Sequence, residues 1–231
     1  MDNFGLLLDE WRVAVDKEVN GKCQPTLLLS AATYYKPVIP WDVVHRYPVE
    51  SIDKNLDWIN AMCYDYHGPW TREDPTGTLA ALFEPTGTLA DLFDPTGHIS
   101  TSGGLQSWIG AGIGRKKLVM GLPLYGRSWR LQNPTVNGLG APAVGAGPGG
   151  EEGYMSYAQV NQFNGQVNAR AVFDEATQSY YSVAGPYWIT YDTVATMTRK
   201  MAYAMGLGIG GYFFWDTSND QGCQFSRPGT H

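Results

Sequence analysis

The chain has 231 residues, of which 43% are hydrophobic, and its formal net charge is −6 with a pI near 5.1. A chain of this length can bury one sizeable core, or a core with a smaller inserted lobe. The acidic balance argues against a nucleic-acid partner, because a phosphate backbone is bound by clustered Lys and Arg side chains. No apolar run approaches the roughly 20 residues of a membrane span, so we expect no membrane partner.

Aromatic residues and cysteines give weaker signals. Aromatics make up 13% of the chain, with 8 Trp and 14 Tyr, so flat faces that can stack on sugar rings are plentiful. Large aromatics also fill cores, which is the commoner role for any single one of them. Cys23, Cys63 and Cys223 are an odd, widely spaced set that fits no disulfide framework, so they leave the cellular compartment open.

The first predicted element is a helix over residues 2–20. Apolar residues recur there at helical spacing, Asp2 can cap the start and Gly21 can end the helix. Residues 26–35 (TLLLSAATYY) then predict a strand. The apolar stretch from Leu27 to Leu29 does not alternate with polar residues, which is typical of a strand covered on both faces.

Three further strands are predicted at residues 56–64 (LDWINAMCY), 117–125 (KLVMGLPLY) and 209–215 (IGGYFFW). Helix-like stretches lie between them at residues 105–113 and 192–205, and Asp192 is placed to cap the second. Buried strands that alternate with amphipathic helices indicate βα units and a parallel sheet.

Two segments interrupt this alternation. Residues 74–100 repeat with a period of ten, as DPTGTLAALF, EPTGTLADLF and DPTGHIS, and each unit predicts a turn followed by a short apolar stretch. We interpret the repeat as a tandem duplication within one loop, too short for a solenoid. Residues 133–153 are dense in Gly and Pro and lead into residues 154–189, where a short helix and three strand-like runs predict a small α+β lobe.

Polar and aromatic residues crowd the ends of three successive predicted strands. The second strand ends in MCYDYHG at residues 62–68, the third in GLPLYGRSW at 121–129, and the fourth in GYFFWDTSND at 211–220. In parallel α/β folds the working residues gather at the C-terminal ends of the strands, so we expect the functional site there.

These motifs resemble family 18 of the glycoside hydrolases. MCYDYHG is similar to that family's Met-x-Tyr-Asp-x-x-Gly strand, and with SAATYY, GLPLYGRSW and GYFFWDTSND the chain resembles the plant class V chitinases. The similarity runs from residue 3 to residue 220, in the family's order of strands five to eight. It implies an α/β fold: a partial (β/α)8 TIM barrel lacking its first four strands, formed by residues 1–129 and 190–231, with a small α+β insertion domain at residues 130–189.

The resemblance also implies a substrate and a set of site residues. The family's substrate is chitin, a β-1,4-linked chain of N-acetylglucosamine. In that family the N-acetyl oxygen of the reacting sugar attacks the anomeric carbon of the same sugar, while a glutamic acid protonates the leaving oxygen. By the family pattern Tyr64 would hydrogen-bond the acetamido oxygen and Asp65 would orient the group. Trp215 would form the apolar floor under the sugar, and Met62 and Tyr125 would line the same pocket.

Other assignments have simpler alternatives. Arg127 would contact the sugar chain or brace the nearby carboxylates, and arginines also serve as structural ties between loops. The alternative for Trp215 is a core tryptophan at a strand end, although its place in GYFFWDTSND favours the sugar-platform role. His67 and Cys63 are metal-binding residue types, but no spaced set of His, Cys and carboxylates completes a metal site. The resemblance implies no cofactor, and an extracellular or vacuolar location, although no signal-peptide core follows Met1.

The family's Asp-x-x-Asp-x-Asp-x-Glu strand, whose last residue is the proton donor, does not occur in the sequence. It would precede the first helix, so either the chain itself lacks the motif or the native polypeptide is longer. We expect no hydrolysis by this chain alone, because Asp65 and Asp216 have other places in the family pattern. Four strands cannot close a barrel, so the open edge favours self-association unless the missing half is supplied in trans. Three hypotheses remain: a chitinase fragment, a non-catalytic chitin-binding lectin or pseudoenzyme, and a scaffold with neither activity.

Overall fold

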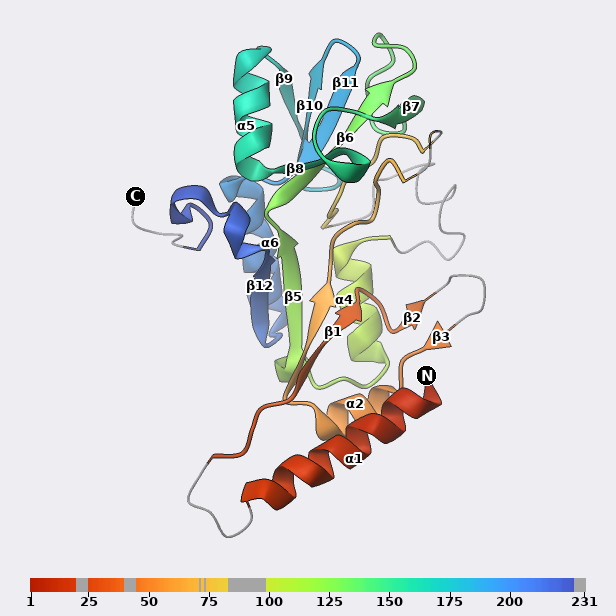
Figure 1. The fold of residues 1–231 in the computed structure, drawn as a ribbon, viewed down its shortest axis with the longest axis vertical. Helices are drawn as coiled ribbons and strands as arrows, with labels where there is room; N and C mark the ends of the chain where they lie inside the picture. The colour runs from red at the N-terminus through yellow and green to blue at the C-terminus, as the bar shows by residue number, and fades with distance from the viewer. Residues whose placement is uncertain (20–24, 40–44, 71, 73, 83–98, 227–231) are drawn as a thin grey trace.

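The computed structural model of the chain describes residues 1–19, 25–39, 45–70, 72, 74–82 and 99–226 (Figure 1). The helices, in chain order, are α1 (Asp2–Val19), α2 (Val49–Asn55), α4 (Thr101–Gly110), α5 (Tyr157–Gln166) and α6 (Val194–Leu207), with 3-10 turns η1 (Arg115–Lys117), η2 (Glu151–Gly153), η3 (Thr217–Asn219) and η4 (Gln221–Cys223). The strands are β1 (Ser30–Tyr34), β2 (Val38–Ile39), β3 (His45–Arg46), β4 (Trp58–Met62), β5 (Leu118–Pro123), β6 (Tyr125–Leu131), β7 (Ala143–Ala146), β8 (Tyr154–Ser156), β9 (Arg170–Asp174), β10 (Ser179–Ala184), β11 (Tyr187–Tyr191) and β12 (Gly211–Trp215).

The four predicted buried strands form one parallel sheet in the order β1-β4-β5-β12, which confirms the prediction of a parallel sheet. The largest core cluster joins this sheet to its helices: Leu118 and Met120 of β5 pack with Trp108 of α4 and Met197 of α6. Apolar side chains at helical spacing thus cover the sheet, as expected for a parallel sheet built from βα units. The short helix α2 packs against α1 at the lower end of the sheet in Figure 1.

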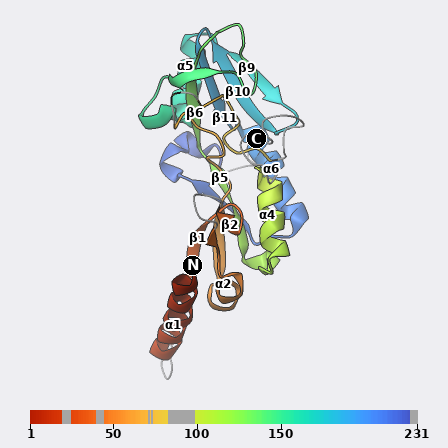
Figure 2. The same ribbon diagram turned by 90° about the vertical axis from the view of Figure 1, so that its right-hand side faces the viewer.

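A second, antiparallel sheet stands beyond the C-terminal ends of the parallel strands (Figures 1 and 2). Its order is β7-β6-β11-β10-β9, with β8 paired to β6, and helix α5 accompanies it. The expected lobe boundaries after residues 129 and 189 fall inside β6 and β11, so this sheet begins and ends a few residues outside the predicted 130–189. The division into barrel portion and inserted lobe stays a prediction.

The beginning of the first strand differs from its prediction. Strand β1 starts at Ser30, and Leu27 and Leu28 before it are 62% and 67% exposed, so the expectation of a strand covered on both faces from residue 26 is wrong. The Leu29 amide donates to the Asp57 carboxylate at 2.7 Å, and the β1–β4 pairing begins only at Ser30. Leu27 and Leu28 therefore lie ahead of the sheet, where no described strand covers them.

Three helix boundaries also differ in detail. Helix α1 is confirmed, but it begins at Asp2, so Asp2 lies in the first turn, and Gly21 lies outside the described residues. Helix α4 starts at Thr101, four residues before the predicted start, with the Ser100 hydroxyl accepting a hydrogen bond from the third amide of the helix. The cap of α6 is Thr193 and not Asp192, because the Asp192 carboxylate is buried in an ion pair instead.

The first unit of the ten-residue repeat, up to residue 82, is part of the folded interior. Residues 83–98, which are its last residue and most of the other two units, lie outside the described residues. Residues 76–82 are all buried. Leu82 donates its amide to the Thr177 carbonyl at 2.9 Å, and the Thr76 hydroxyl donates to the Gly138 carbonyl at 2.9 Å. A Cβ at Gly77 would overlap the His67 ring, so the glycine is required by close packing. None of the described helices combines the length and apolar character needed to cross a bilayer.

Candidate functional site

Three of the parallel strands bring their C-terminal ends side by side. Trp215 at the end of β12 is in register with Pro123 at the end of β5, and the Leu124 amide donates to the Trp215 carbonyl at 2.8 Å. Gly121 of β5 permits a close approach, since a Cβ there would lie 2.7 Å from the Tyr64 ring and 2.8 Å from the Ala61 carbonyl oxygen. The glycine in GLPLYGRSW thus lets the Tyr64 ring approach the neighbouring strand closely.

An aromatic cluster follows directly above these strand ends. Buried Tyr64 and Tyr125 meet edge to face at 6.2 Å between ring centroids, and Met62 and Phe213 pack against the same cluster. Burial raises the pKa of both phenols above the usual value, and the charge of Asp65 adds to the shift. Both hydroxyls therefore stay protonated, so each can donate a hydrogen bond to a neutral acceptor such as an amide oxygen.

Asp65 and Arg127 form an ion pair beside this cluster. Asp65 has a left-handed backbone (φ 57°), and its Oδ1 lies 3.3 Å from the Arg127 Nη2. Arg127 also reaches Glu152 with 3.4 Å between Nη1 and Oε2, and its guanidinium lies 5.8 Å from the Tyr125 ring centroid. The Asp65 charge also raises the pKa of the nearby Tyr125 phenol. Of the two roles expected for Arg127, these contacts supply the bracing of carboxylates, and contact with a sugar stays a prediction.

Trp215 differs from the other candidate residues in its exposure. Its side chain is 55% exposed, which excludes the alternative that it is a core tryptophan. Its main chain adjoins Pro123 and Leu124, immediately before Tyr125. No ring contact between Trp215 and the Tyr64 cluster occurs among the described residues, so a pocket shared by the two side chains stays a prediction.

Two side chains that were not predicted from the sequence complete the cluster. Tyr154 of β8 stacks on Tyr125 at 5.0 Å with an interplanar angle of 27°, and its hydroxyl accepts a hydrogen bond from Asn219 at 2.7 Å. Phe213 faces Tyr64 from β12 at 6.4 Å. The position of Phe213 could have been predicted, because its spacing of two residues from Trp215 places both side chains on one face of the strand. Tyr154 had no such signal, because β8 reaches the site only through the antiparallel sheet.

The two metal-binding residue types near the site have other environments. His67 Nδ1 lies 3.0 Å from the Thr78 carbonyl oxygen, and burial lowers the pKa of the ring. Burial raises the pKa of the Cys63 thiol to about 12, so this cysteine is inert as a thiolate ligand at neutral pH. Within the described part of the chain, no group of three or more His, Cys, Asp or Glu side chains gathers as a metal site would require.

Comparison with known proteins identifies a family. The sequence profile of glycosyl hydrolases family 18 matches residues 1–220. The chain is 43% identical to Nod factor hydrolase protein 1 of Medicago truncatula, covering 95% of this chain and 54% of that protein. It is 40% identical to a class V chitinase of Lotus japonicus, covering 100% of this chain and 55% of the relative. The chain thus spans little more than half the length of these relatives.

Solved structures agree with the sequence comparisons. A mutant class V chitinase from Nicotiana tobaccum in complex with NAG4 superposes with a TM-score of 0.89 at 38% identity, covering 98% of this chain and 62% of that one. A chitinase-like agglutinin from Robinia pseudoacacia superposes with a TM-score of 0.79 at 33% identity, covering 97% of this chain and 61% of that one. The fold is therefore that of the C-terminal part of a family 18 (β/α)8 barrel with its insertion, as the motifs predicted.

Proposed function

Since the chain belongs to family 18 of the glycosyl hydrolases, we propose that it binds oligomers of β-1,4-linked N-acetylglucosamine at the C-terminal ends of β4, β5 and β12. The observation that carries the proposal is the cluster of Tyr64, Asp65, Tyr125 and Arg127 around the end of β4. Tyr64 donates to the acetamido oxygen, Asp65 orients that group, and the exposed Trp215 indole stacks on the sugar ring. Uncharged chitin requires no basic groove, which agrees with the net charge of −6.

We further propose that the chain alone binds without cleaving. A general acid needs a protonated carboxyl beside the glycosidic oxygen, and the acidic family motif is absent from the sequence. Asp65 is held by Arg127, and Asp216 accepts a hydrogen bond from the Ser218 amide at 2.9 Å. Both carboxylates are therefore already engaged by other groups. The agglutinin among the structural relatives favours this lectin-like interpretation.

Calorimetry with chitin oligomers tests the proposal. We expect the Trp215→Ala variant to bind the tetramer at least about thirtyfold more weakly, corresponding to roughly 2 kcal/mol for an exposed aromatic anchor. Tyr64→Phe removes one hydrogen bond and is expected to weaken binding about fivefold. The control is Trp11→Ala on α1, which is 50% exposed at the opposite end of the strands and should bind normally (Figure 1).

Two results decide between the hypotheses, one from the titration and one from an assay of reducing ends. Absence of binding heat for the unmodified chain at millimolar tetramer contradicts the proposed binding site. Release of new reducing ends from the oligomer contradicts the proposal that the chain alone does not hydrolyse.

We also propose self-association through the open edges of the parallel sheet. Within the described residues β1 and β12 each pair with a single strand, and β12 leaves Tyr212 38% exposed. Two copies related by a twofold axis along the barrel would set β12 of each beside β1 of the other, giving the eight parallel strands that close such a barrel. Exposed apolar strand edges favour this pairing.

Sedimentation velocity over a wide range of protein concentration checks the self-association. We expect a monomer–dimer equilibrium for the unmodified chain, weakened by Tyr212→Lys, because a charge on an edge strand opposes pairing. Met205→Lys on α6, at a position that is 72% exposed, is the matched control and should leave the equilibrium unchanged. A strict monomer at every concentration contradicts the proposal.

By family membership we propose a secreted or vacuolar location. A fluorescent fusion to the complete coding sequence, followed by microscopy, tests it. A signal confined to the cytosol would contradict this location.

A further inference from the structure

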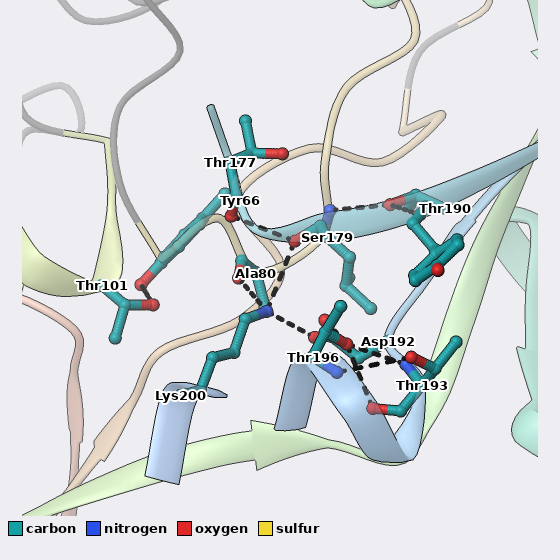
Figure 3. A network of polar contacts seen from close by, with 12 residues as sticks. Tyr66, Ala80, Thr101, Thr177, Ser179, Thr190, Asp192, Thr193, Thr196 and Lys200 are labelled. Carbon is teal, nitrogen blue, oxygen red and sulfur yellow. Dashed lines mark hydrogen bonds and ion pairs between the residues drawn. The ribbon is translucent and has the colours of Figure 1, made fainter. Parts of the chain in front are cut away.

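A fully buried ion pair lies outside the proposed sugar site (Figure 3). Lys200 of α6 and Asp192, which precedes the helix, are 1% and 2% exposed, and Nζ lies 2.6 Å from Oδ2. The other Asp192 oxygen accepts a hydrogen bond from the buried Thr196 hydroxyl at 2.8 Å. Burial lowers the pKa of Lys200, and the Asp192 charge opposes that shift. The pair thus carries the desolvation penalty that makes buried ion pairs poor stabilisers compared with apolar residues of similar volume.

The remaining hydrogen bonds of Lys200 hold two other parts of the chain. Its ammonium donates to the Ala80 carbonyl and to the Ser179 hydroxyl of β10, so all three N–H groups have partners. Leu79, next to Ala80, donates its amide to the Thr190 hydroxyl of β11 at 3.2 Å. The ion pair therefore fixes residues 79 and 80 against helix α6 and the antiparallel sheet at once. An apolar pair in the same space would fill the volume but would donate nothing to the Ala80 carbonyl.

Leu79 and Ala80 are also the buried neighbours of the proposed sugar site. They form one apolar cluster with Tyr64 and Tyr125, and the Leu79 carbonyl accepts a hydrogen bond from the Tyr66 amide at 3.0 Å. A shift of this short segment therefore disturbs the apolar cluster to which both tyrosine rings belong. Because cores are close-packed, such a displacement is transmitted to the rings and not absorbed by empty space.

We propose that Lys200 and Asp192 are positioning residues for the oligosaccharide site: they hold the Leu79–Ala80 wall that sets the orientation of Tyr64 and Tyr125. This inference rests on the proposed function for its effect on sugar binding, but its structural step stands without a ligand. The proposal gives a role to the first repeat unit, which contains Leu79 and Ala80. It also explains why a charged pair occupies a position where apolar residues would stabilise the fold as well.

The test separates positioning from stability by comparing a single and a double variant. Lys200→Met leaves Asp192 buried without its cation and is expected to destabilise the fold strongly. Adding Asp192→Val removes the second charge, and Thr196 keeps its hydrogen bond to the Thr193 carbonyl, so the double variant should recover most of the lost thermal stability. Its affinity for the chitin tetramer should nevertheless stay roughly threefold to tenfold below that of the unmodified chain, because the Ala80 carbonyl remains unheld.

Ile52→Val on α2 is the matched control for the remaining loss of stability. Ile52 is fully buried at the far end of the parallel sheet, so its variant should unfold at a lower temperature and bind the tetramer normally (Figure 1). Recovery of native affinity together with stability in the double variant would overturn the inference.

A measurement without sugar keeps the inference independent of the proposed function. The methyl resonances of Leu79 and the ring resonances of Tyr64 should shift in the double variant and stay in place in Ile52→Val. Unchanged Leu79 and Tyr64 resonances would overturn the positioning role even if oligosaccharide binding is established. If the unmodified chain binds no oligomer, the proposed function fails, and the resonances alone decide the positioning role.

Discussion

Replacing Ala81 by Asp is expected to lower the free energy of unfolding by about 3–5 kcal/mol, the range for an uncompensated buried charge. Ala81 is 1% exposed and belongs to the largest core cluster, together with Leu105 and Tyr66. Its carbonyl accepts a hydrogen bond from the Thr101 amide at 2.9 Å, which ties it to the start of α4. A carboxylate there would face apolar side chains, so it would be protonated or would displace residues 76–82.

The ten-residue repeat itself contains this change from alanine to aspartate at the corresponding position of its second unit. Aligning DPTGTLAALF with EPTGTLADLF places Asp91 of the second unit opposite Ala81 of the first. The two units are otherwise nearly identical, so this single position makes the first unit fit the buried site of residues 76–82 better than the second unit would. The two units are therefore not interchangeable at that site.

Urea denaturation followed by circular dichroism measures the effect. The control is Ala202→Asp on the exposed face of α6, which should lose only about 0.7 kcal/mol through helix propensity. Equal losses in the two variants would show that the Ala81 position tolerates a carboxylate, and the argument from the repeat would then fail.

The parallel sheet and the strand-end cluster could be predicted because each has a local sequence signal. The strands are short apolar runs bounded by Gly, Pro or Asp, and parallel strands expose their working residues at one end. Tyr64, Asp65, Tyr125 and Arg127 therefore come together although the last two are about 60 residues away from the first two. The prediction of burial was wrong at Leu27 and Leu28 for a related reason. An apolar run indicates that its side chains favour burial, but it does not show whether another helix or strand lies close enough to bury them.

Contacts made by the antiparallel sheet could not be predicted in the same way. Tyr154 contacts Tyr125, and Glu152 contacts Arg127, only because β8 pairs with β6. No periodicity in the sequence predicts such a pairing. The Lys200–Asp192 pair was missed for a similar reason. Asp192 precedes a helix and has the residue type of a cap, whereas its true partner lies eight positions later and depends on how α6 packs.

Replacing Trp188 by Ala is expected to cost about 3–5 kcal/mol, the range for truncating a buried tryptophan. Trp188 of β11 lies directly opposite Trp129 of β6, and the two rings meet edge to face at 5.3 Å. Trp188 also stacks on Tyr181 at 5.0 Å, and both tryptophans are fully buried in the core of the antiparallel sheet. Truncation leaves a cavity that the paired strands cannot collapse to fill, because cross-strand neighbours hold their register.

Trp188→Phe is the matched control, since it keeps an aromatic ring on Tyr181 and removes an indole N–H that has no hydrogen-bond partner among the described residues. We expect it to lose clearly less stability than Trp188→Ala. Hydrogen exchange then locates the damage: in Trp188→Ala the amides of β10 and β11 should exchange much faster, while those of β4 and β5 keep their protection. Acceleration confined in this way supports a separate lobe at residues 130–189, because a cavity in one cooperative unit weakens only that unit. Equal acceleration in both sheets would instead mean that they unfold together, which contradicts the predicted division.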